Sequence, residues 1–241
     1  MEITISYKNV TYPNNHIIAK LSNLIYNNIK ILKLISNIYI LGENQKEKFL
    51  EEPDKYRAFL EQVIKSGIVS GHIRKEEANE FLELWFSISD ENLGHVLEQL
   101  IAKLGPYNRN MCEYDKSMET KVFETNQEND FDVVFFDKKF SEEYNYGTNI
   151  KIKDYNEFHE CKKNVCTFIP FKIDMRVKSN VKRKLDFIKN TYDLKKSGKY
   201  YIPTFYPIVY SQRDFLRDYS DGKFSFIEIL SVDDLYLRYS S

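Results

Sequence analysis

The sequence has few of the residues that build disulfide frameworks or zinc sites. It contains three cysteines, Cys112, Cys161 and Cys166, and no CxxC pair. An odd number of cysteines without paired spacing favours neither a disulfide framework nor a zinc site, and we interpret Cys161 and Cys166 as small buried residues. We therefore expect a reducing, cytoplasmic setting.

Long apolar segments are absent as well. The longest apolar run, residues 29–41, is interrupted by Lys30, Lys33, Ser36 and Asn37 and is too short to span a bilayer. The first residues, MEITISYKN, lack the basic start and the small-residue cleavage site of a signal peptide. The sequence therefore predicts neither membrane insertion nor secretion.

Three motifs of common enzyme classes are also missing. The sequence has no glycine-rich phosphate loop, no HExxH and no GxSxG pattern. What it does have is the composition of a folded globular protein, with 241 residues, 42% hydrophobic and 29% charged. This length is sufficient for one large domain or two modest ones, each with a real core.

Charge is balanced over the whole chain but not along it. The 35 basic and 36 acidic residues give no overall signal for nucleic acid. Residues 43–98 contain 7 basic and 13 acidic residues, a net charge of −6, whereas residues 172–199 contain 10 and 3, a net charge of +7. The basic segment is compatible with a phosphate-binding face, and a solvated lysine-rich helix explains it equally well. The candidates for nucleic-acid contact are Lys178, Lys182, Arg183 and Lys184.

The first ninety residues predict a mostly helical N-terminal region. After a possible strand at residues 3–7, apolar side chains recur at helical spacing over residues 16–36, 45–66 and 74–87. We expect residues 1–90 to recognise a target, bind a partner or dimerise, and the sequence does not choose among these roles.

Residues 91–241 predict an α/β domain with a mixed central sheet. A helix over residues 93–104 has Asp90 as its expected N-cap and Gly105-Pro106 as its stop. From residue 93 onward, the expected elements follow the order helix, three strands, helix, strand. The expected strands are 121–124, 131–136, 157–168, 200–210 and 224–231, and the expected helices after the first are 177–196 and 232–239.

The segment NEFHECKKNV, residues 156–165, places an acid beside an amine. On a strand, alternate side chains share a face, so Glu160 and Lys162 would point one way and His159 and Cys161 the other. We therefore expect His159 to pack or hydrogen-bond rather than act as a general base. This arrangement suits phosphodiester hydrolysis, in which a carboxylate holds a divalent metal ion and a nearby amine steadies the attacking water. The alternative is a surface ion pair on an edge strand.

A second segment supplies the partner acid. In NDFDVVFF, residues 129–136, Asp130 and Asp132 have the same strand parity and share a face. If this strand pairs with residues 157–168, Asp132 and Glu160 meet at one end of the sheet. Two carboxylates at that point could hold Mg²⁺ or Mn²⁺, which are hard cations that prefer oxygen ligands.

Together these pieces resemble the restriction-endonuclease-like, or PD-(D/E)xK, nuclease superfamily. The resemblance lies in Glu98 of LGHVLEQLIAKLG, Asp132 of DFDVVFFD and the Glu160-Cys161-Lys162 triplet of FHECKKN. The superfamily's core order of helix, three strands, helix, strand matches residues 91–210. The resemblance therefore implies a nuclease-like domain over residues 91–241 and leaves residues 1–90 unassigned.

The resemblance implies a role for each of these residues. Asp132 and Glu160 would hold Mg²⁺, or Mn²⁺ as a substitute, together with the backbone carbonyl of Cys161. Lys162 would orient or activate the attacking water, and Glu98 would complete a second metal shell or hold a water. The implied activity is metal-dependent endonucleolytic hydrolysis of DNA, with RNA as the alternative substrate, in bacterial restriction or antiphage defence.

The sequence departs from the superfamily pattern in two ways. No proline precedes the first acid, and 28 positions separate Asp132 from Glu160, for which we expect a hairpin through residues 141–149. The long gap leaves Asp130 and Asp137 as rival first metal ligands. Asp130 ranks next after Asp132, because Asp137 has the wrong strand parity to share a face with Asp132. A non-catalytic nucleic-acid or protein-binding module and a purely structural α/β domain are the alternatives from other classes. A homodimer would suit double-strand cleavage, because two symmetry-related sites can address both strands.

Overall fold

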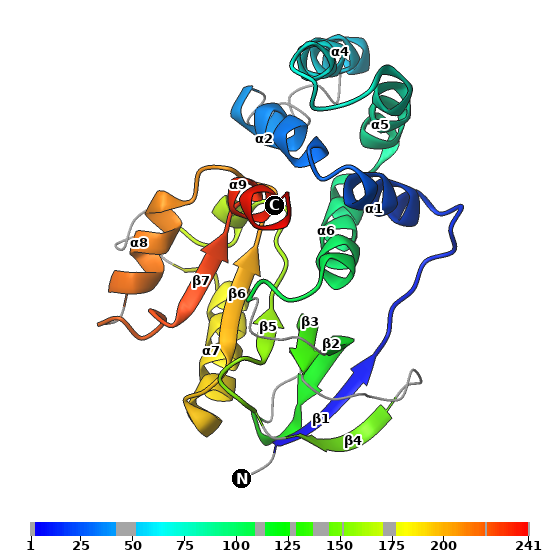
Figure 1. The fold of residues 1–241 in the computed structure, drawn as a ribbon. Helices are drawn as coiled ribbons and strands as arrows, with labels where there is room; N and C mark the ends of the chain where they lie inside the picture. The colour runs from blue at the N-terminus through cyan, green and yellow to red at the C-terminus, as the bar shows by residue number, and fades with distance from the viewer. Residues whose placement is uncertain are drawn as a thin grey trace. The chain divides into compact units, whose positions relative to one another are not determined.

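The chain divides into two compact units in the computed structural model (Figure 1). The sheet unit comprises residues 1–11, 105–203 and 209–229, and the helical unit comprises residues 12–104, 204–208 and 230–241. The structure describes residues 3–41, 52–108, 114–125, 129–136, 145–150, 152–170, 177–219 and 221–240. The bounds of these two units differ from the predicted division at residue 90. The assignment of residues 1–90 and 91–241 to two domains stays a prediction.

The sheet unit is built on one mixed sheet, so the predicted α/β class is confirmed. Across the described strands the order is β4-β1-β2-β3-β5-β6-β7. Neighbours from β4 to β5 run antiparallel, whereas β5 and β6 run parallel. The strands are β1 (Ile3–Lys8), β2 (Asp115–Val122), β3 (Phe131–Phe136), β4 (Asn145–Ile150), β5 (Glu157–His159), β6 (Lys199–Pro203) and β7 (Ile227–Leu230).

The pairing of β3 with β5 has the register that the predicted acid pair requires. Val133 lies opposite His159 in this antiparallel pair, so the same register places Asp132 opposite Glu160. Directly opposed residues of an antiparallel pair share a face of the sheet. The predicted strand over residues 131–136 is confirmed.

The chain stays bonded to β6 for a short distance beyond the end of β5. The N–H of Glu160 donates to the carbonyl of Tyr201, and the N–H of Lys162 donates to the carbonyl of Pro203, both at 2.9 Å. Alternate N–H groups therefore continue the parallel pattern as far as Lys162, which keeps the side chains of Glu160 and Lys162 on one face.

The predicted strand over residues 157–168 is too long. β5 ends at His159, and the 3₁₀ turn η2 (Val165–Thr167) follows. The side-chain oxygen of Asn164 accepts a hydrogen bond from the N–H of Cys166 at 2.9 Å and so caps this turn. Asparagine favours such local bonds over a strand ladder, which is why the extended chain ends there.

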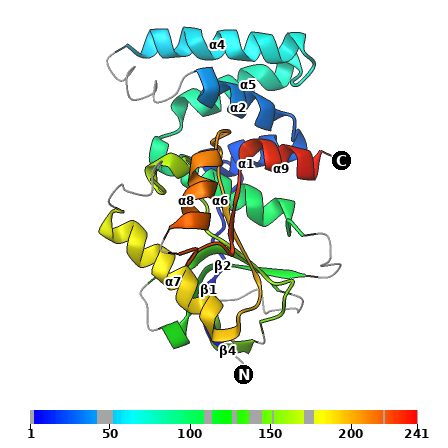
Figure 2. The ribbon, with the colours of Figure 1, turned by 90° about the vertical axis from the view of Figure 1, so that its left-hand side faces the viewer.

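Helix α7 (Ser179–Lys195) connects β5 to β6 and packs on one face of the sheet (Figures 1 and 2). Its ring of Phe187 lies 4.8 Å from that of Phe131 in β3. Phe158 of β5 and Tyr200 of β6 stack beside them at 4.9 Å. These buried aromatic contacts fix the position of α7 against the three strands that carry the site. The predicted helix over residues 177–196 is confirmed to within two residues.

Other predicted strands differ at their ends. β2 begins at Asp115 rather than at residue 121, and the 3₁₀ turn η1 (Phe123–Thr125) replaces its expected end. The expected strand over residues 200–210 ends at Pro203, and helix α8 (Tyr210–Asp218) begins at residue 210. β7 lies within the predicted range 224–231.

The long excursion between the two acids contributes a strand at another place in the sheet. Residues 145–150 form β4, which pairs antiparallel with β1. Residues 137–144, which include part of the predicted hairpin, lie outside the described residues. The expected short strand at residues 3–7 is confirmed as β1.

The helical unit consists of helices that pack in pairs. Helix α1 packs on α5 and α6, α2 packs on α4 and α9, and α4 packs on α5. No helix in the described parts of the chain is long and apolar enough to cross a membrane. The helices are α1 (Ile17–Asn27), α2 (Ile31–Leu41), α4 (Pro53–Val69), α5 (Lys75–Ser87), α6 (Asp90–Leu104) and α9 (Val232–Tyr239).

Two helix predictions need correction. The helix expected over residues 16–36 is divided at Asn28, whose side chain donates to the carbonyl of His72 and to a carboxylate oxygen of Glu77, at 3.3 and 3.0 Å. The N-cap of α6 is Ser89 rather than Asp90, because the Ser89 hydroxyl accepts the N–H of Asn92 at 3.3 Å.

Three further helix predictions stand. The helices expected over residues 74–87, 93–104 and 232–239 correspond to α5, α6 and α9. Gly105, at φ +82°, ends α6 as expected. Of the helix expected over residues 45–66, α4 begins at Pro53, and residues 42–51 lie outside the described residues.

Two helical glycines should respond in opposite ways to alanine. A Cβ atom on Gly67 of α4 would lie 2.1 Å from Cδ2 of Leu34, which is fully buried in α2, so Gly67→Ala should lower the free energy of unfolding by about 1–3 kcal/mol through overpacking. Gly94 of α6 has nothing within 4 Å of the added atom, so Gly94→Ala should raise it by up to about 1 kcal/mol. Urea denaturation of both variants measures the difference. Equal effects of the same sign would contradict the packing of α4 on α2.

Candidate active site

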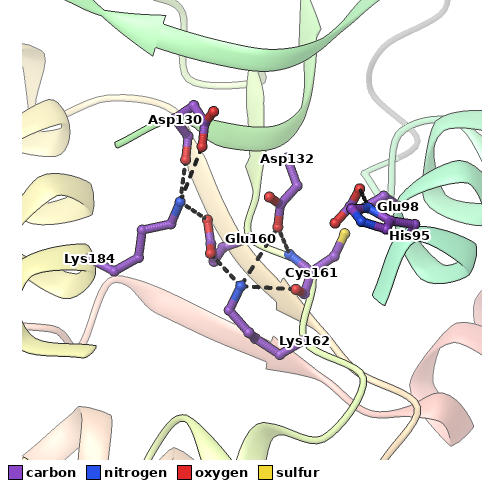
Figure 3. A network of polar contacts seen from close by, with 8 residues as sticks. All are labelled: His95, Glu98, Asp130, Asp132, Glu160, Cys161, Lys162 and Lys184. Carbon is purple, nitrogen blue, oxygen red and sulfur yellow. Dashed lines mark hydrogen bonds and ion pairs between the residues drawn. The ribbon is translucent and has the colours of Figure 1, made fainter. Parts of the chain in front are cut away.

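Four charged side chains from three segments meet in the sheet unit (Figure 3). Asp132 comes from β3, Glu160 and Lys162 come from the chain after β5, and Lys184 comes from α7. The Glu160 side chain is only 2% exposed, and those of Asp132 and Lys184 are 18% and 13% exposed. The structure thus brings together the three residues Asp132, Glu160 and Lys162 that the sequence predicted, and it adds a fourth.

The ammonium group of Lys162 lies among three oxygen atoms. Its Nζ is 2.5 Å from Oε1 of Glu160, 3.1 Å from the carbonyl oxygen of Cys161 and 3.9 Å from Oδ2 of Asp132. The N–H of Cys161 donates to the same Oδ2 atom at 2.6 Å, which fixes the Asp132 carboxylate. These oxygens belong to the three groups that the family resemblance implies as metal ligands, and they surround the Lys162 ammonium group.

Lys184 approaches Glu160 from the other side. Its Nζ lies 2.8 Å from Oε2 of Glu160 and 3.6 Å from Oδ1 of Asp130, and it donates a hydrogen bond to the backbone carbonyl of Asp130. The contact with Oε2 has the distance of an ion pair but not the angle of a hydrogen bond, so no group among the described residues hydrogen-bonds this oxygen. Glu160 is therefore held between two ammonium groups (Figure 3).

Both lysines remain charged at neutral pH. Burial acts to lower the pKa of the Lys162 amine, but the charges of Glu160 and Asp132 outweigh it and raise this pKa above the ordinary value of 10.5. The pKa of Lys184 is raised in the same way, with burial opposed by Glu160 and Asp132. A buried carboxylate with two such partners is compensated for the water that it has lost.

Asp130 differs from Asp132 in its partners. Its carboxylate is 34% exposed and contacts Lys184, whereas that of Asp132 contacts Lys162 and the N–H of Cys161. This placement favours Asp132 over Asp130 as the acid that belongs with the Glu160-Cys161-Lys162 triplet.

His159 lies outside this group, as the strand parity predicts. Its Nε2 is 2.9 Å from Glu157, and both side chains are buried. Glu157 also accepts hydrogen bonds from the N–H groups of Tyr107 and Asn108. The pair therefore anchors the chain after α6 to β5, a role that the sequence did not indicate.

Glu98 belongs to the helical unit. It lies on α6, is 21% exposed and contacts Nδ1 of His95 at 3.0 Å. Its predicted role as a further acid of the metal site stays a prediction.

The predicted basic surface is only partly exposed. Lys178, Lys182 and Arg183 are exposed, and among the described residues none of them forms an ion pair. Lys184, predicted as a fourth member, instead turns to Glu160. Cys161 is buried as expected, whereas Cys166 is only half-buried.

The oxygen atoms at the site are of the type that Mg²⁺ and Mn²⁺ prefer. They are the carboxylates of Asp132 and Glu160 and the carbonyl of Cys161, and Mg²⁺ keeps several waters beside so few protein ligands. Within the parts of the chain that the structure describes, no three or more His, Cys, Asp or Glu side chains form a group that could hold a metal ion alone. The donor set therefore fits a divalent cation only with the backbone carbonyl and water included.

Comparisons with protein families, with curated proteins and with solved structures found no match.

Replacement of Lys162 should reveal how strongly the buried Glu160 depends on it. Lys162→Met should lower the free energy of unfolding by about 1–3 kcal/mol, because Lys184 then remains as the principal counter-charge. Lys223→Met removes a lysine from an exposed pair with Asp186 and should cost less than about 1 kcal/mol. Chemical denaturation of both variants and the wild type provides the comparison.

The pH dependence of this difference has a defined sign. A lysine whose pKa is raised by folding stabilises the folded state fully below its unfolded pKa of 10.5, and this contribution is lost as the pH rises through the folded pKa. The stability difference between wild type and Lys162→Met should therefore be constant from about pH 6 to about pH 9. A difference that disappears within this interval would mean that the Lys162 ion pair does not stabilise the fold.

Proposed function

We propose that the protein is a metal-dependent nuclease that hydrolyses phosphodiester bonds, with DNA as the favoured substrate. The observation that carries the proposal is the convergence of the Asp132, Glu160 and Cys161 oxygens on one cationic group, the Lys162 ammonium. Three oxygens that can surround an ammonium group can also provide ligands to Mg²⁺ or Mn²⁺. The order of elements along the chain, α6, β2, β3, β5, α7, β6, further supports a restriction-endonuclease-like core. In the sequence β4 comes between β3 and β5, but in the sheet it lies beside β1.

Each residue has a chemical task in this proposal. Asp132, Glu160 and the Cys161 carbonyl would hold the divalent ion, which supplies a polarised water and charge stabilisation at the phosphorus centre. Lys162 would keep its ammonium close to these oxygens, where it can orient the attacking water and offset the negative charge that develops on the phosphoryl oxygens. The N–H of Cys161 holds Asp132 in position for this work.

The exposed cations of α7 support a nucleic-acid substrate. Lys178, Lys182 and Arg183 lie at the start of the helix that also carries Lys184 to the site. Farther along the same helix, Lys189 is paired with Asp193, so its charge is neutralised locally. A basic surface at the start of α7 would contact phosphates without recognising the nucleotide sequence. RNA remains the alternative substrate, because the proposed catalytic group does not read the sugar.

A second candidate is a non-catalytic nucleic-acid-binding module. The observation that favours it is that both oxygens of Glu160 already lie within 3 Å of a lysine ammonium group. Such a site could be a structural ion-pair cluster that binds no metal. Metal-dependent cleavage separates the two candidates.

The direct test is cleavage of linear and circular double-stranded DNA, single-stranded DNA and RNA with Mg²⁺, with Mn²⁺ and with EDTA. Wild type should cut only with metal, and Lys162→Met and Asp132→Asn should each reduce the rate at least about hundredfold, because each removes a group that stabilises the transition state. Lys223→Met, which changes the same charge at an exposed pair, should cut at the wild-type rate. Cleavage by both site variants at that rate would exclude this site as the catalytic centre.

The basic surface can be tested separately by the salt dependence of binding. Lys182→Ala and Arg183→Ala should each weaken DNA binding across all sequences and reduce the slope of log Kd against log salt by about 1. Lys189→Ala is the matched control on the same helix and should leave the slope unchanged, because its charge is paired with Asp193. Fluorescence anisotropy in EDTA at several salt concentrations measures these slopes without cleavage. Wild-type slopes for both variants would place the nucleic-acid surface elsewhere.

A further inference from the structure

The second lysine at the candidate site has no role in the proposed reaction. Lys184 lies 2.8 Å from Oε2 of Glu160, while Lys162 lies 2.5 Å from Oε1 of the same carboxylate. Lys184 is 13% exposed and comes from a helix whose position is fixed by aromatic packing on the sheet. A buried ammonium group in this position repels any cation that approaches Glu160.

Resting on the proposed function, we propose that Lys184 is a positioning residue that keeps the affinity of the acid pair for a divalent cation low until a nucleic-acid phosphate is present. It does so by occupying one oxygen of Glu160 with a fixed positive charge. Its contact with the backbone carbonyl and the carboxylate of Asp130 holds the ammonium at this place.

The charges at the site account for this coupling. Asp130, Asp132 and Glu160 contribute three negative charges, and Lys162 and Lys184 contribute two positive ones, so the group has a net charge of −1. A divalent cation would change this value to +1, and one phosphodiester group would then neutralise it. Without the cation the group repels a phosphate, and without the phosphate the two lysines weaken the attraction of the three carboxylates for the cation. Metal and nucleic acid therefore favour each other's binding, and the coupling is reciprocal.

Lys184 affects metal affinity in two opposite ways, because it repels the cation and also orders the Glu160 side chain. The repulsion is the larger effect. The Glu160 side chain is 2% exposed and still contacts Lys162, so loss of Lys184 leaves its conformation constrained by packing. By contrast, a unit positive charge within ion-pair distance of a metal ligand, in a partly buried site, opposes a doubly charged ion strongly. Removal of Lys184 should therefore strengthen metal binding rather than weaken it.

The test is a measurement of Mn²⁺ affinity by calorimetry and by electron paramagnetic resonance, without DNA and with a non-cleavable phosphorothioate duplex. In the absence of DNA, Lys184→Met should bind Mn²⁺ at least about tenfold more tightly than wild type. Lys184→Arg, which retains the charge, should bind with wild-type affinity, and so should Lys189→Met, which removes a lysine paired with Asp193 on the same helix. The duplex should increase the affinity of wild type more than that of Lys184→Met.

A second readout guards against a variant that merely folds poorly. Removal of a counter-charge of the buried Glu160 should lower the Tm of metal-free Lys184→Met, and saturating Mn²⁺ should raise this Tm by more than it raises that of wild type. A variant damaged only in its packing would show the decrease without the larger recovery.

The possible outcomes separate this inference from the proposed function. If wild type binds Mn²⁺ and cleaves DNA but Lys184→Met binds Mn²⁺ equally well, the role of Lys184 is wrong and the nuclease proposal stands. Tight binding by Lys184→Arg as well as by Lys184→Met would also overturn it, because the effect would then not follow the charge. If no variant binds Mn²⁺ and wild type cuts nothing, both proposals fail.

Discussion

Burial of the Glu160 carboxylate between two ammonium groups is the interaction on which the arrangement of the site depends. An ionised carboxylate that is 2% exposed is tolerated only where other groups replace the water that it has lost. Lys162 and Lys184 do so from two different segments, one continuing β5 and the other in α7. A movement of either segment would leave a buried charge with one partner fewer, so the ion pairs and the hydrophobic packing of α7 on the sheet support the same geometry.

The sheet explains why these groups meet where they do. β3 and β5 are antiparallel neighbours, so an acid near the start of one lies opposite a residue just beyond the end of the other. The parallel neighbour β6 then holds the chain after β5 through the N–H groups of Glu160 and Lys162. The side chains of Glu160 and Lys162 thereby share a face although regular strand structure has ended.

Much of the fold was predictable from local sequence, and much of the candidate site was too. Strand β3 and helices α5, α7 and α9 have clear apolar periods, and the parity of Glu160 and Lys162 follows from the period of a strand. The end of the extended chain after β5 was not predictable from hydrophobic periodicity, because the 3₁₀ turn η2 that follows it is capped by one side-chain hydrogen bond at Asn164.

The position of Lys184 was also beyond reach of the sequence alone. Its neighbours Lys182 and Arg183 are equally basic, and only the packing of α7 on the sheet decides which of them faces inward. Similarly, Glu157 resembles any other strand acid until its partners in distant segments, Tyr107 and Asn108, are known. Long-range contacts of this kind leave no periodic signal.

The place of β1 in the sheet has a consequence for how the molecule can be divided. β1 lies between β4 and β2, yet the chain passes through most of the helical unit between β1 and β2. A shortened protein that starts at residue 91 would therefore lack an internal strand, and the facing edges of β2 and β4 would lose their backbone partners. During synthesis on the ribosome the first strand must likewise wait for more than a hundred residues before β2 emerges to pair with it. The sheet unit can therefore complete its sheet only after most of the helical unit has been synthesised.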